Sequence, residues 1–337
     1  MSVWKRNVLF LAALLAIFLA VAYSVSGLFL PASAVSRRVI VEIPPGANAA
    51  AIGARLERQG VIRSRHAFVL LVRGMGYAHQ LQAGEYELDP SHGLYEILEK
   101  IASGEAISHW ITIPEGFTLR QIAQQIERAG LGNALRFHEL ATHGSGRFDP
   151  GAEIPLPTLE GYLFPDTYKL PTGATEEAIL RAMVDNFRAK VTEPLGEEIR
   201  RSGRTLHEIV IVASMIEREA RVPEDRPKIA AVIYNRLRRG MRLQIDATVL
   251  YAIGRTRFTN FAVESGVDSR YNTYRYAGLP PGPICNPGLA SIRAALAPAP
   301  VDFLYYVADP ATGAHLFART HEEHLANRRK VERRAAD

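Results

Sequence analysis

The 337 residues are too many for one domain of ordinary size, and they predict a terminal segment followed by two folded units. Hydrophobic residues make up 47% and charged residues 22%, which excludes a wholly disordered chain, and the formal net charge of +5 suits an anionic polymer or a membrane surface without indicating nucleic acid by itself. The single cysteine, Cys285, excludes an intramolecular disulfide framework and a cysteine-rich zinc site.

The N-terminus predicts a membrane anchor. Lys5 and Arg6 precede an uncharged stretch, and its apolar part, residues 8–30, would span roughly 34 Å as a helix, enough to cross a hydrocarbon core. The two basic residues favour a cytoplasmic tail at residues 1–7. A cleaved signal peptide is the alternative, since Ala32-Ser33-Ala34 is similar to a cleavage site, but the apolar run exceeds the usual signal core of about 7–15 residues. Both interpretations place the remaining residues outside the cytoplasm.

A small α+β unit follows the anchor. Residues 39–43 and 84–88 alternate in hydropathy as strands do. A helix that ends at Gly60 comes after the first strand, and an amphipathic helix over residues 94–101, closed by Gly104, comes after the second. This order predicts a mixed unit of about seventy residues.

Part of this unit recurs 70 residues later in the chain. The segment Ile43-Pro44-Pro45-Gly46 aligns without a gap with Ile113-Pro114-Glu115-Gly116. At the same offset, the matched pairs along the following helix are Ile52 and Ile122, Leu56 and Ile126, and Gly60 and Gly130. A constant offset across strand, turn and helix predicts an internal repeat of one supersecondary unit. Two unrelated strand–turn–helix pieces are the alternative.

The remaining elements are predicted from composition and periodicity. Residues 132–157 are polar and rich in glycine and proline, which predicts a loop-rich connection. The aromatic run at 159–168 predicts a corner of the core, with a carbohydrate-facing edge as the alternative. Residues 175–255 are predicted to be mostly helical, residues 301–317 to form a short strand pair, and the tail from His321 to form a charged helix.

The segment from Glu208 to Arg221 holds the candidate catalytic carboxyl. It is apolar almost all round before Glu217 and Glu219, which predicts a buried helix that ends in two glutamates. At about 100° per residue these glutamates point in nearly opposite directions, so only one faces a given cleft. A carboxyl at the end of an apolar face loses hydration, which raises its pKa and suits a general acid. A solvated ion pair with Arg218 or Arg221 is the alternative.

Neutral polar and aromatic side chains cluster after this helix and predict a glycan-binding surface. A sugar polymer needs many neutral hydrogen bonds and a few ring faces. The candidate substrate-binding residues are Asn235, Gln244, Asp246, Thr248, Tyr271, Asn272, Thr273, Tyr274 and Asn286. Together, residues 159–168 and 240–288 predict a long polar groove. For residues 278–288 taken alone, a proline-stiffened structural loop is the alternative.

These segments resemble the YceG-like family of endolytic murein transglycosylases. The run Ala213-Ser214-Met215-Ile216-Glu217-Arg218-Glu219-Ala220 is similar to the family's ASIIEKE-type motif. Further blocks that match in the family's order are residues 161–168, 235–237, 241–248, 271–274 and 278–284. The resemblance covers the chain from the predicted anchor to about residue 330.

The resemblance implies an α+β protein with a transmembrane helix at residues 8–30, a LysM-like subdomain at 37–109 and a larger, mainly helical, lysozyme-like catalytic domain with short strands at 110–337. Glu219, the second member of the E-x-E pair, is the implied catalytic residue. The implied enzyme is a lyase that cleaves, without hydrolysis, the β-1,4 bond between N-acetylmuramic acid and N-acetylglucosamine inside glycan strands. It would leave 1,6-anhydromuramic ends and terminate strand elongation.

The resemblance also implies a single-pass protein of the bacterial inner membrane, with its catalytic domain in the periplasm, peptidoglycan as substrate and cell-wall synthases as partners. We expect no cofactor and no metal, because no glycine-rich phosphate loop precedes a helix and His321-Glu322-Glu323-His324 lacks the H-E-x-x-H spacing. Nucleic acid is not an expected partner. The alternative functions are a non-catalytic peptidoglycan-binding scaffold and a hydrolase that uses Asp246 or Glu217 as a second carboxylate.

Overall fold

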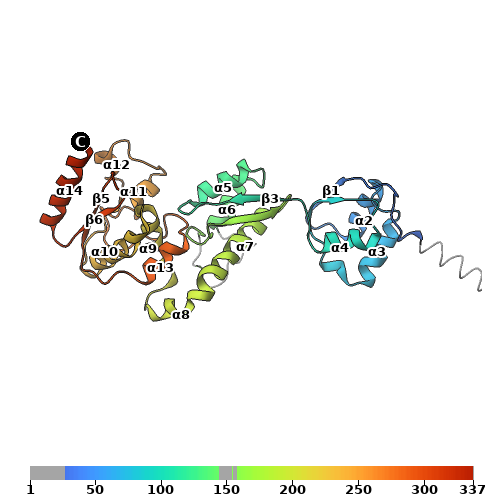
Figure 1. Cartoon of the computed structure of the whole chain (residues 1–337), viewed down its shortest axis with the longest axis horizontal. Helices are drawn as coiled ribbons and strands as arrows, with labels where there is room; N and C mark the ends of the chain where they lie inside the picture. Colours follow the sequence, from blue (N-terminus) through green and yellow to red (C-terminus); the bar gives the residue numbers. More distant parts are fainter. Residues whose placement is uncertain (1–26, 144–153, 155–157, 337) are drawn as a thin grey trace, which may run out of the picture. The chain divides into compact units, whose positions relative to one another are not determined.

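The computed structural model describes residues 27–143, 154 and 158–336 (Figure 1). The chain divides into two compact units, Met1–Trp110 with Lys169–Thr175, and Ile111–Tyr168 with Glu176–Asp337. Both contain helices and short two-stranded sheets, so the predicted α+β class is confirmed.

Most of the predicted anchor, residues 8–26, lies outside the described residues. Across residues 27–143, 154 and 158–336, the structure holds no helix with the length and hydrophobicity that a membrane crossing requires.

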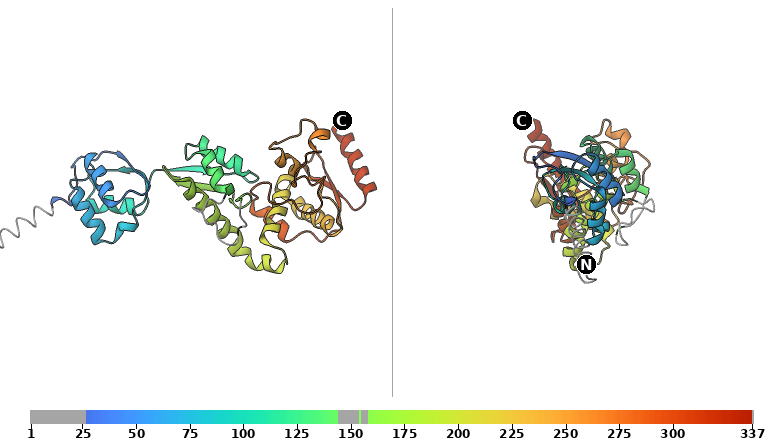
Figure 2. Two further views of the ribbon diagram at one scale, coloured as in Figure 1. Left: turned by 180° about the vertical axis from the view of Figure 1, so that it is seen from behind. Right: turned by 90° about the vertical axis from the view of Figure 1, so that its right-hand side faces the viewer.

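The first unit is built around a two-stranded antiparallel sheet. Strand β1 (Val39–Ile43) pairs with β2 (Gly84–Leu88), which places Val41 opposite Tyr86. Its helices are α2 (Ala49–Arg58), α3 (Arg65–Gly74), the 3-10 turn η1 (Tyr77–His79) and α4 (Leu94–Ala102). They gather around the sheet (Figures 1 and 2) and bury one apolar core, so the predicted strand and helix positions of this unit are confirmed.

The next elements run from the first unit into the second. They are β3 (Ser108–Thr112), α5 (Leu119–Arg128), α6 (Ala134–His143), β4 (Thr167–Pro171), α7 (Glu176–Phe187), the π-helical stretch η2 (Arg188–Thr192) and α8 (Glu193–Arg201). Strand β3 pairs with β4. The order strand, two helices, strand, helix is the same as in the first unit.

The predicted repeat is confirmed and extends beyond the sequence match. Helices α2 and α5 have ten residues each, and both are followed by a left-handed glycine, Gly60 at φ +67° and Gly130 at φ +69°. In each copy a glutamate of this helix, Glu57 or Glu127, accepts a hydrogen bond from the first backbone N–H of the next helix. The two copies therefore have equivalent helix ends as well as equivalent strands.

Helix α6 corrects the prediction of a loop-rich connection at residues 132–157. The Asn133 side chain accepts a hydrogen bond from the backbone N–H of Arg136 at 2.9 Å, which begins the helix, and Phe137 is fully buried. The glycines and prolines that suggested a loop all lie after the helix, apart from Gly132. Averaging the composition over the whole segment hid a helical stretch of ten residues.

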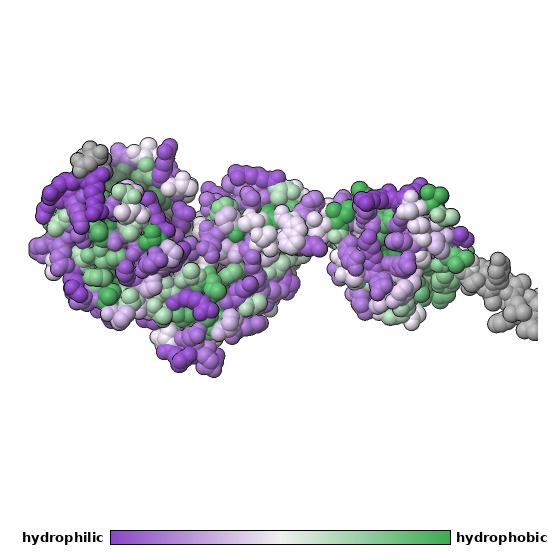
Figure 3. Space-filling model, viewed as in Figure 1, coloured by the Kyte–Doolittle hydropathy of each residue, from purple (hydrophilic) through white to green (hydrophobic). Residues whose placement is uncertain are grey.

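The rest of the second unit surrounds one buried helix, α9 (Leu206–Glu219), which packs against α10, α11 and α13. The elements after α9 are η3 (Pro223–Asp225), α10 (Arg226–Arg238), α11 (Asp246–Ala252), α12 (Phe261–Glu264), α13 (Leu289–Leu296), β5 (Tyr305–Ala308), β6 (His315–Ala318) and α14 (His321–Ala336). The predicted helical region, strand pair and charged terminal helix are confirmed. The surface over α14 is largely hydrophilic (Figure 3).

Candidate active site

Helix α9 carries Glu219 to the edge of the core. The helix begins with a capping box in which Thr205 and Glu208 bond each other's backbone N–H groups at 3.2 and 2.8 Å. Every residue from Ile209 to Ile216 is buried, as predicted from the apolar run. Glu219 is the last helical residue and is only partly buried, so its carboxyl lies where an apolar helix reaches the surface.

Two other segments meet the Glu219 carboxyl, β5 and the start of α11. The Tyr306 hydroxyl, on β5, donates a hydrogen bond to Glu219 Oε2 at 3.3 Å. The backbone N–H of Ala247, in the first turn of α11, also donates to this carboxyl. Asp246, one residue earlier, is exposed and acts on it through its charge.

The surroundings raise the pKa of Glu219 to about 7. Burial is the largest cause, because it disfavours the charged carboxylate, and the charge of Asp246 adds to it. The hydrogen bonds from Tyr306 and Ala247 and the charge of Arg218 oppose the rise, since each favours the carboxylate. A carboxyl with this pKa is well suited to give and take a proton near neutral pH.

Asp246 is held by a second tyrosine. The Tyr274 hydroxyl donates a hydrogen bond to Asp246 Oδ1 at 2.5 Å. The Tyr274 ring in turn contacts the half-exposed Phe261 of α12, with ring centroids 5.7 Å apart. The acidic pair Glu219 and Asp246 thus has one tyrosine hydroxyl on each carboxyl.

Glu217 is turned to another part of the chain. Its Oε2 accepts a hydrogen bond from the backbone N–H of Gly288 at 3.0 Å, just before α13. Glu115 lies near it, and burial together with the charge of Glu217 raises the pKa of Glu115. The prediction that the two glutamates of the E-x-E pair face different surroundings is confirmed.

Gln244 lies on the loop that leads into α11. Its backbone has φ +54°, the left-handed region, and among the described residues it is the one non-glycine residue there. The loop is fixed by Thr273, whose carbonyl accepts from the Gln244 N–H at 3.2 Å and whose hydroxyl accepts from the Ile245 N–H at 2.9 Å. The Thr273 and Thr248 hydroxyls are themselves 3.0 Å apart and both residues are buried.

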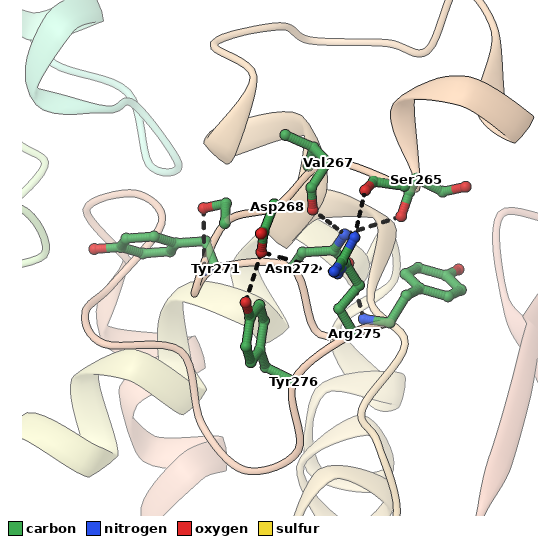
Figure 4. A network of polar contacts seen from close by, with 10 residues as sticks. Ser265, Val267, Asp268, Tyr271, Asn272, Arg275 and Tyr276 are labelled. Atoms are coloured by element: carbon green, nitrogen blue, oxygen red, sulfur yellow. Dashed lines mark hydrogen bonds and ion pairs between the residues drawn. The ribbon is translucent and has the colours of Figure 1, made fainter.

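Asn272 is fully buried and organises the loop around it (Figure 4). Its side-chain amide donates to the carbonyls of Ser265 and Val267 at 2.9 and 2.7 Å, and its Oδ1 accepts from the Tyr274 N–H at 3.0 Å. These bonds set the backbone that carries Tyr274 toward Asp246. The structure therefore gives Asn272 a supporting place behind the acidic pair.

Asn286 is also fully buried and connects distant segments. Its Oδ1 accepts from the N–H groups of Gly161 and Leu163, both at 2.9 Å. Its Nδ2 donates to the Phe117 carbonyl at 2.9 Å and to Glu160 Oε1 at 3.1 Å. The surrounding loop, residues 282–288, is buried throughout, so the structural-loop interpretation fits this segment.

Asn235 lies in α10, where its amide donates to the carbonyls of Val301 and Phe303 at 3.0 and 2.8 Å. It also lines a surface hollow of about 470 Å³ whose lining does not include Glu219. Tyr271 is partly buried, and its ring lies 5.0 Å from that of Tyr251.

Two patterns emerge among the predicted substrate-binding residues. Gln244 and Asp246 are exposed, and Tyr271 and Tyr274 are partly exposed. The others are buried, with polar groups bonded inside the protein: Asn235, Thr248, Asn272, Thr273 and Asn286. The aromatic run forms a core corner, since residues 159–165 are buried, and this corrects the prediction that residues 159–168 line a groove.

Sequence reasoning missed Tyr306 and Glu160. The sequence predicts Tyr306 only as part of a strand, because nothing in the local pattern connects β5 with a helix 87 residues away in the chain. Glu160 is almost fully buried, and burial raises its pKa to about 8 while Leu119, Tyr251 and Asn286 donate hydrogen bonds to it. A charged residue inside an aromatic core run was the available signal for Glu160.

A family model and curated relatives match most of this chain. The model of the YceG-like family matches residues 41–330. An endolytic murein transglycosylase of Bacillus subtilis is 37% identical over 303 residues, covering 85% of this chain and 82% of the relative. One of Streptococcus pneumoniae is 31% identical over 331 residues, covering 88% of this chain and 59% of that longer protein.

A solved structure agrees with the sequence matches. The crystal structure of a YceG-like protein of Listeria monocytogenes superposes with a TM-score of 0.59 at 34% identity, covering 87% of this chain and 99% of that one. The family model spans most of the chain and includes Glu219 and the elements around it. The chain belongs to the YceG-like family.

Proposed function

We propose that this protein is an endolytic murein transglycosylase, a lyase that cuts peptidoglycan glycan strands between N-acetylmuramic acid and N-acetylglucosamine. The observation that carries the proposal is the partly buried Glu219 carboxyl, whose pKa is raised to about 7. The names of the Bacillus and Streptococcus relatives support the same activity.

One carboxyl is enough for this reaction. Protonated Glu219 donates its proton to the bridging oxygen as the bond from that oxygen to C1 of muramic acid breaks. The sugar's own 6-hydroxyl oxygen then bonds to C1, and the Glu219 carboxylate accepts the hydroxyl proton. The cycle consumes no water and returns Glu219 to its protonated form. Because the nucleophile belongs to the substrate, the step avoids a bimolecular entropy cost.

The negative charge of Asp246 supports the acid role of Glu219. It raises the pKa of Glu219 and so helps keep the acid protonated. Its position also favours hydrolysis as the second candidate function, since a hydrolase needs a second carboxylate to activate water or attack C1. The fate of water at the cut therefore separates the two reactions.

The exposed members of the predicted set are the proposed glycan contacts. Gln244, Asp246, Tyr271 and Tyr274 keep polar or ring surface available. We assign the buried members an indirect part, which is to hold the loops that present these four side chains.

The N-terminal features remain proposals of their own. Residues 8–30 would anchor the chain in the bacterial inner membrane, with residues 37–337 in the periplasm, supported by the apolar run behind Lys5 and Arg6. The LysM-like subdomain at 37–109, the lysozyme-like catalytic domain at 110–337 and an association with cell-wall synthases rest on the family resemblance. N-terminal sequencing of the mature protein tests the anchor, and a start at Val35 would contradict it.

Incubation of the full-length chain with purified glycan strands tests the endolytic activity. Internal cutting produces fragments of many lengths from the earliest time points. Release of disaccharides alone would show action at strand ends, and an inert protein would favour a non-catalytic scaffold.

A further inference from the structure

We propose that Tyr306 is a positioning residue of this reaction: its hydroxyl group holds Oε2 of Glu219, so that the carboxyl keeps one orientation while it exchanges the proton with the glycan. The inference rests on the proposed role of Glu219. Nothing in the sequence around Tyr306 resembles a catalytic motif, and the assignment comes from the contact at 3.3 Å between β5 and the end of α9.

The Tyr306 ring is fixed by its neighbours. It lies on the β5–β6 hairpin, where Tyr306 pairs with Phe317 across the strands. The His315 ring meets it edge-on, with centroids 5.3 Å apart and planes at 89°. Phe317 contacts it with centroids 6.3 Å apart. A ring held on two sides has little rotamer freedom to lose when its hydroxyl bonds Glu219.

The hairpin itself is tied to the segment that follows the catalytic helix. Asp225 Oδ2 accepts hydrogen bonds from the backbone N–H of His315 at 2.6 Å and bonds its Nδ1 at 3.1 Å. Asp225 comes six residues after Glu219 in the chain, and both Asp225 and His315 are buried. The donor on β5 and the acceptor on α9 are therefore held to one another through a second buried contact, independent of the hydroxyl.

Charges around the pair favour a neutral, donating phenol. Burial and the negative charge of Glu219 raise the pKa of Tyr306 well above its usual value, with Asp246 adding to the rise and Arg236 opposing it. The hydroxyl therefore keeps its proton throughout the working range of the enzyme. On the carboxyl side, Asp246 favours the protonated acid and Arg218 the carboxylate.

This arrangement matters because Glu219 must serve first as an acid and then as a base. Burial and Asp246 alone would favour a carboxyl that gives up its proton reluctantly. A hydrogen bond from Tyr306 stabilises the carboxylate that forms when the proton leaves. The same bond stops the side chain from rotating between the two proton transfers, which depend on geometry.

The test compares Tyr306→Phe with Tyr276→Phe in the full-length chain. Phenylalanine keeps the ring of Tyr306 and removes only the hydroxyl. Tyr276 is a matched control, because its hydroxyl also donates to a carboxylate, Asp268 Oδ1 at 2.6 Å, and makes no bond to Glu219. Thermal unfolding of each variant verifies the fold before the measurements.

Two readouts are taken against pH: kcat/KM on glycan strands, and the ¹³C titration of side-chain carboxyls, with Glu219 assigned from the spectrum of Glu219→Gln. Tyr306→Phe is expected to move both the high-pH fall in rate and the Glu219 titration upward by about half a unit to one unit. The low-pH rate is expected to drop about tenfold. Tyr276→Phe is expected to match the wild type in both.

Unchanged Glu219 titration in Tyr306→Phe would overturn the inference, even if the rate falls, because a merely structural hydroxyl lowers rates without moving a pKa. An equal shift in Tyr276→Phe would overturn it as well. If the wild-type chain cuts no glycan while Tyr306→Phe still shifts the titration, the proposed function fails and the hold of Tyr306 on the carboxyl is supported.

Discussion

Glu217 and Glu219 stand two residues apart on α9 and bond to two different segments, each distant from α9 in the chain. Glu217 accepts a hydrogen bond from the Gly288 N–H at 3.0 Å, whereas Glu219 accepts one from the Tyr306 hydroxyl at 3.3 Å. The two glutamates therefore have different roles. Glu217 secures the turn before α13, and Glu219 is left at the surface with Asp246 as its charged neighbour.

Glu219→Gln is expected to abolish activity while leaving the fold intact. The amide is nearly isosteric but cannot donate a carboxylic proton, so we expect a loss of about a thousandfold or more in kcat. Glu217→Gln is the matched control and should retain most activity, with a stability loss of about 1 kcal/mol from its weakened bond to Gly288. Rates and denaturation midpoints of both variants check this. An active Glu219→Gln beside an inactive Glu217→Gln would reverse the assignment.

The rate should fall as pH rises through neutrality. Glu219 must enter the reaction protonated, and its pKa is raised to about 7, so the acid is present below that pH and lost above it. Removing the Asp246 charge with Asp246→Asn should move the fall to lower pH, because that charge is one cause of the raised pKa. Profiles of kcat/KM against pH measure both effects. If kcat/KM of Asp246→Asn fell at a higher pH than that of the wild type, the Asp246 charge would not raise the pKa of Glu219.

Asn286→Ala is expected to destabilise the protein by about 3 kcal/mol. The change leaves the N–H groups of Gly161 and Leu163 and the carbonyl of Phe117 without their side-chain partner inside the core. Asn260→Ala, which removes only the exposed cap of α12, should cost about 1 kcal/mol. Chemical denaturation gives both values. Equal losses of unfolding free energy in the two variants would mean that the buried hydrogen bonds of Asn286 stabilise the protein no more than an exposed helix cap does.

Gln244→Gly tests two features of this residue, its left-handed backbone by stability and its exposed side chain by KM. Glycine adopts φ +54° without strain, so stability should hold or rise by up to about 1 kcal/mol despite the lost side chain. If the exposed amide contacts glycan, KM should rise several-fold in the same variant. Unfolding and steady-state kinetics measure the two effects. An unchanged KM would remove Gln244 from the proposed glycan contacts.

Local patterns predicted most of the fold. The alternating hydropathy of residues 39–43 and 84–88 predicts β1 and β2, and the apolar run before Glu217 predicts the buried helix α9. Each of these elements is determined by side chains that are close together in the chain. The composition of residues 132–157 does not predict helix α6, because the glycines and prolines that follow the helix dominate the segment.

The candidate site was only half predictable, for a different reason. Glu219 was found because the E-x-E pair ends an apolar helix, and its family motif is local. Whether a polar residue such as Asn272 or Asn286 faces glycan or the core depends on partners distant in the chain, which no local pattern records. Tyr306 depends in the same way on the pairing of β5 with β6 and on its contact with α9.

In the proposed reaction the substrate's own hydroxyl, and not water, attacks the muramic acid carbon. Digestion in water enriched in oxygen-18, followed by mass spectrometry of the new ends, tests it most directly. Attack by the 6-hydroxyl predicts ends lighter by one water than hydrolysed ends, without heavy oxygen at C1. Heavy oxygen at C1 of the new muramic ends would contradict it and would make Asp246 the carboxylate that activates water.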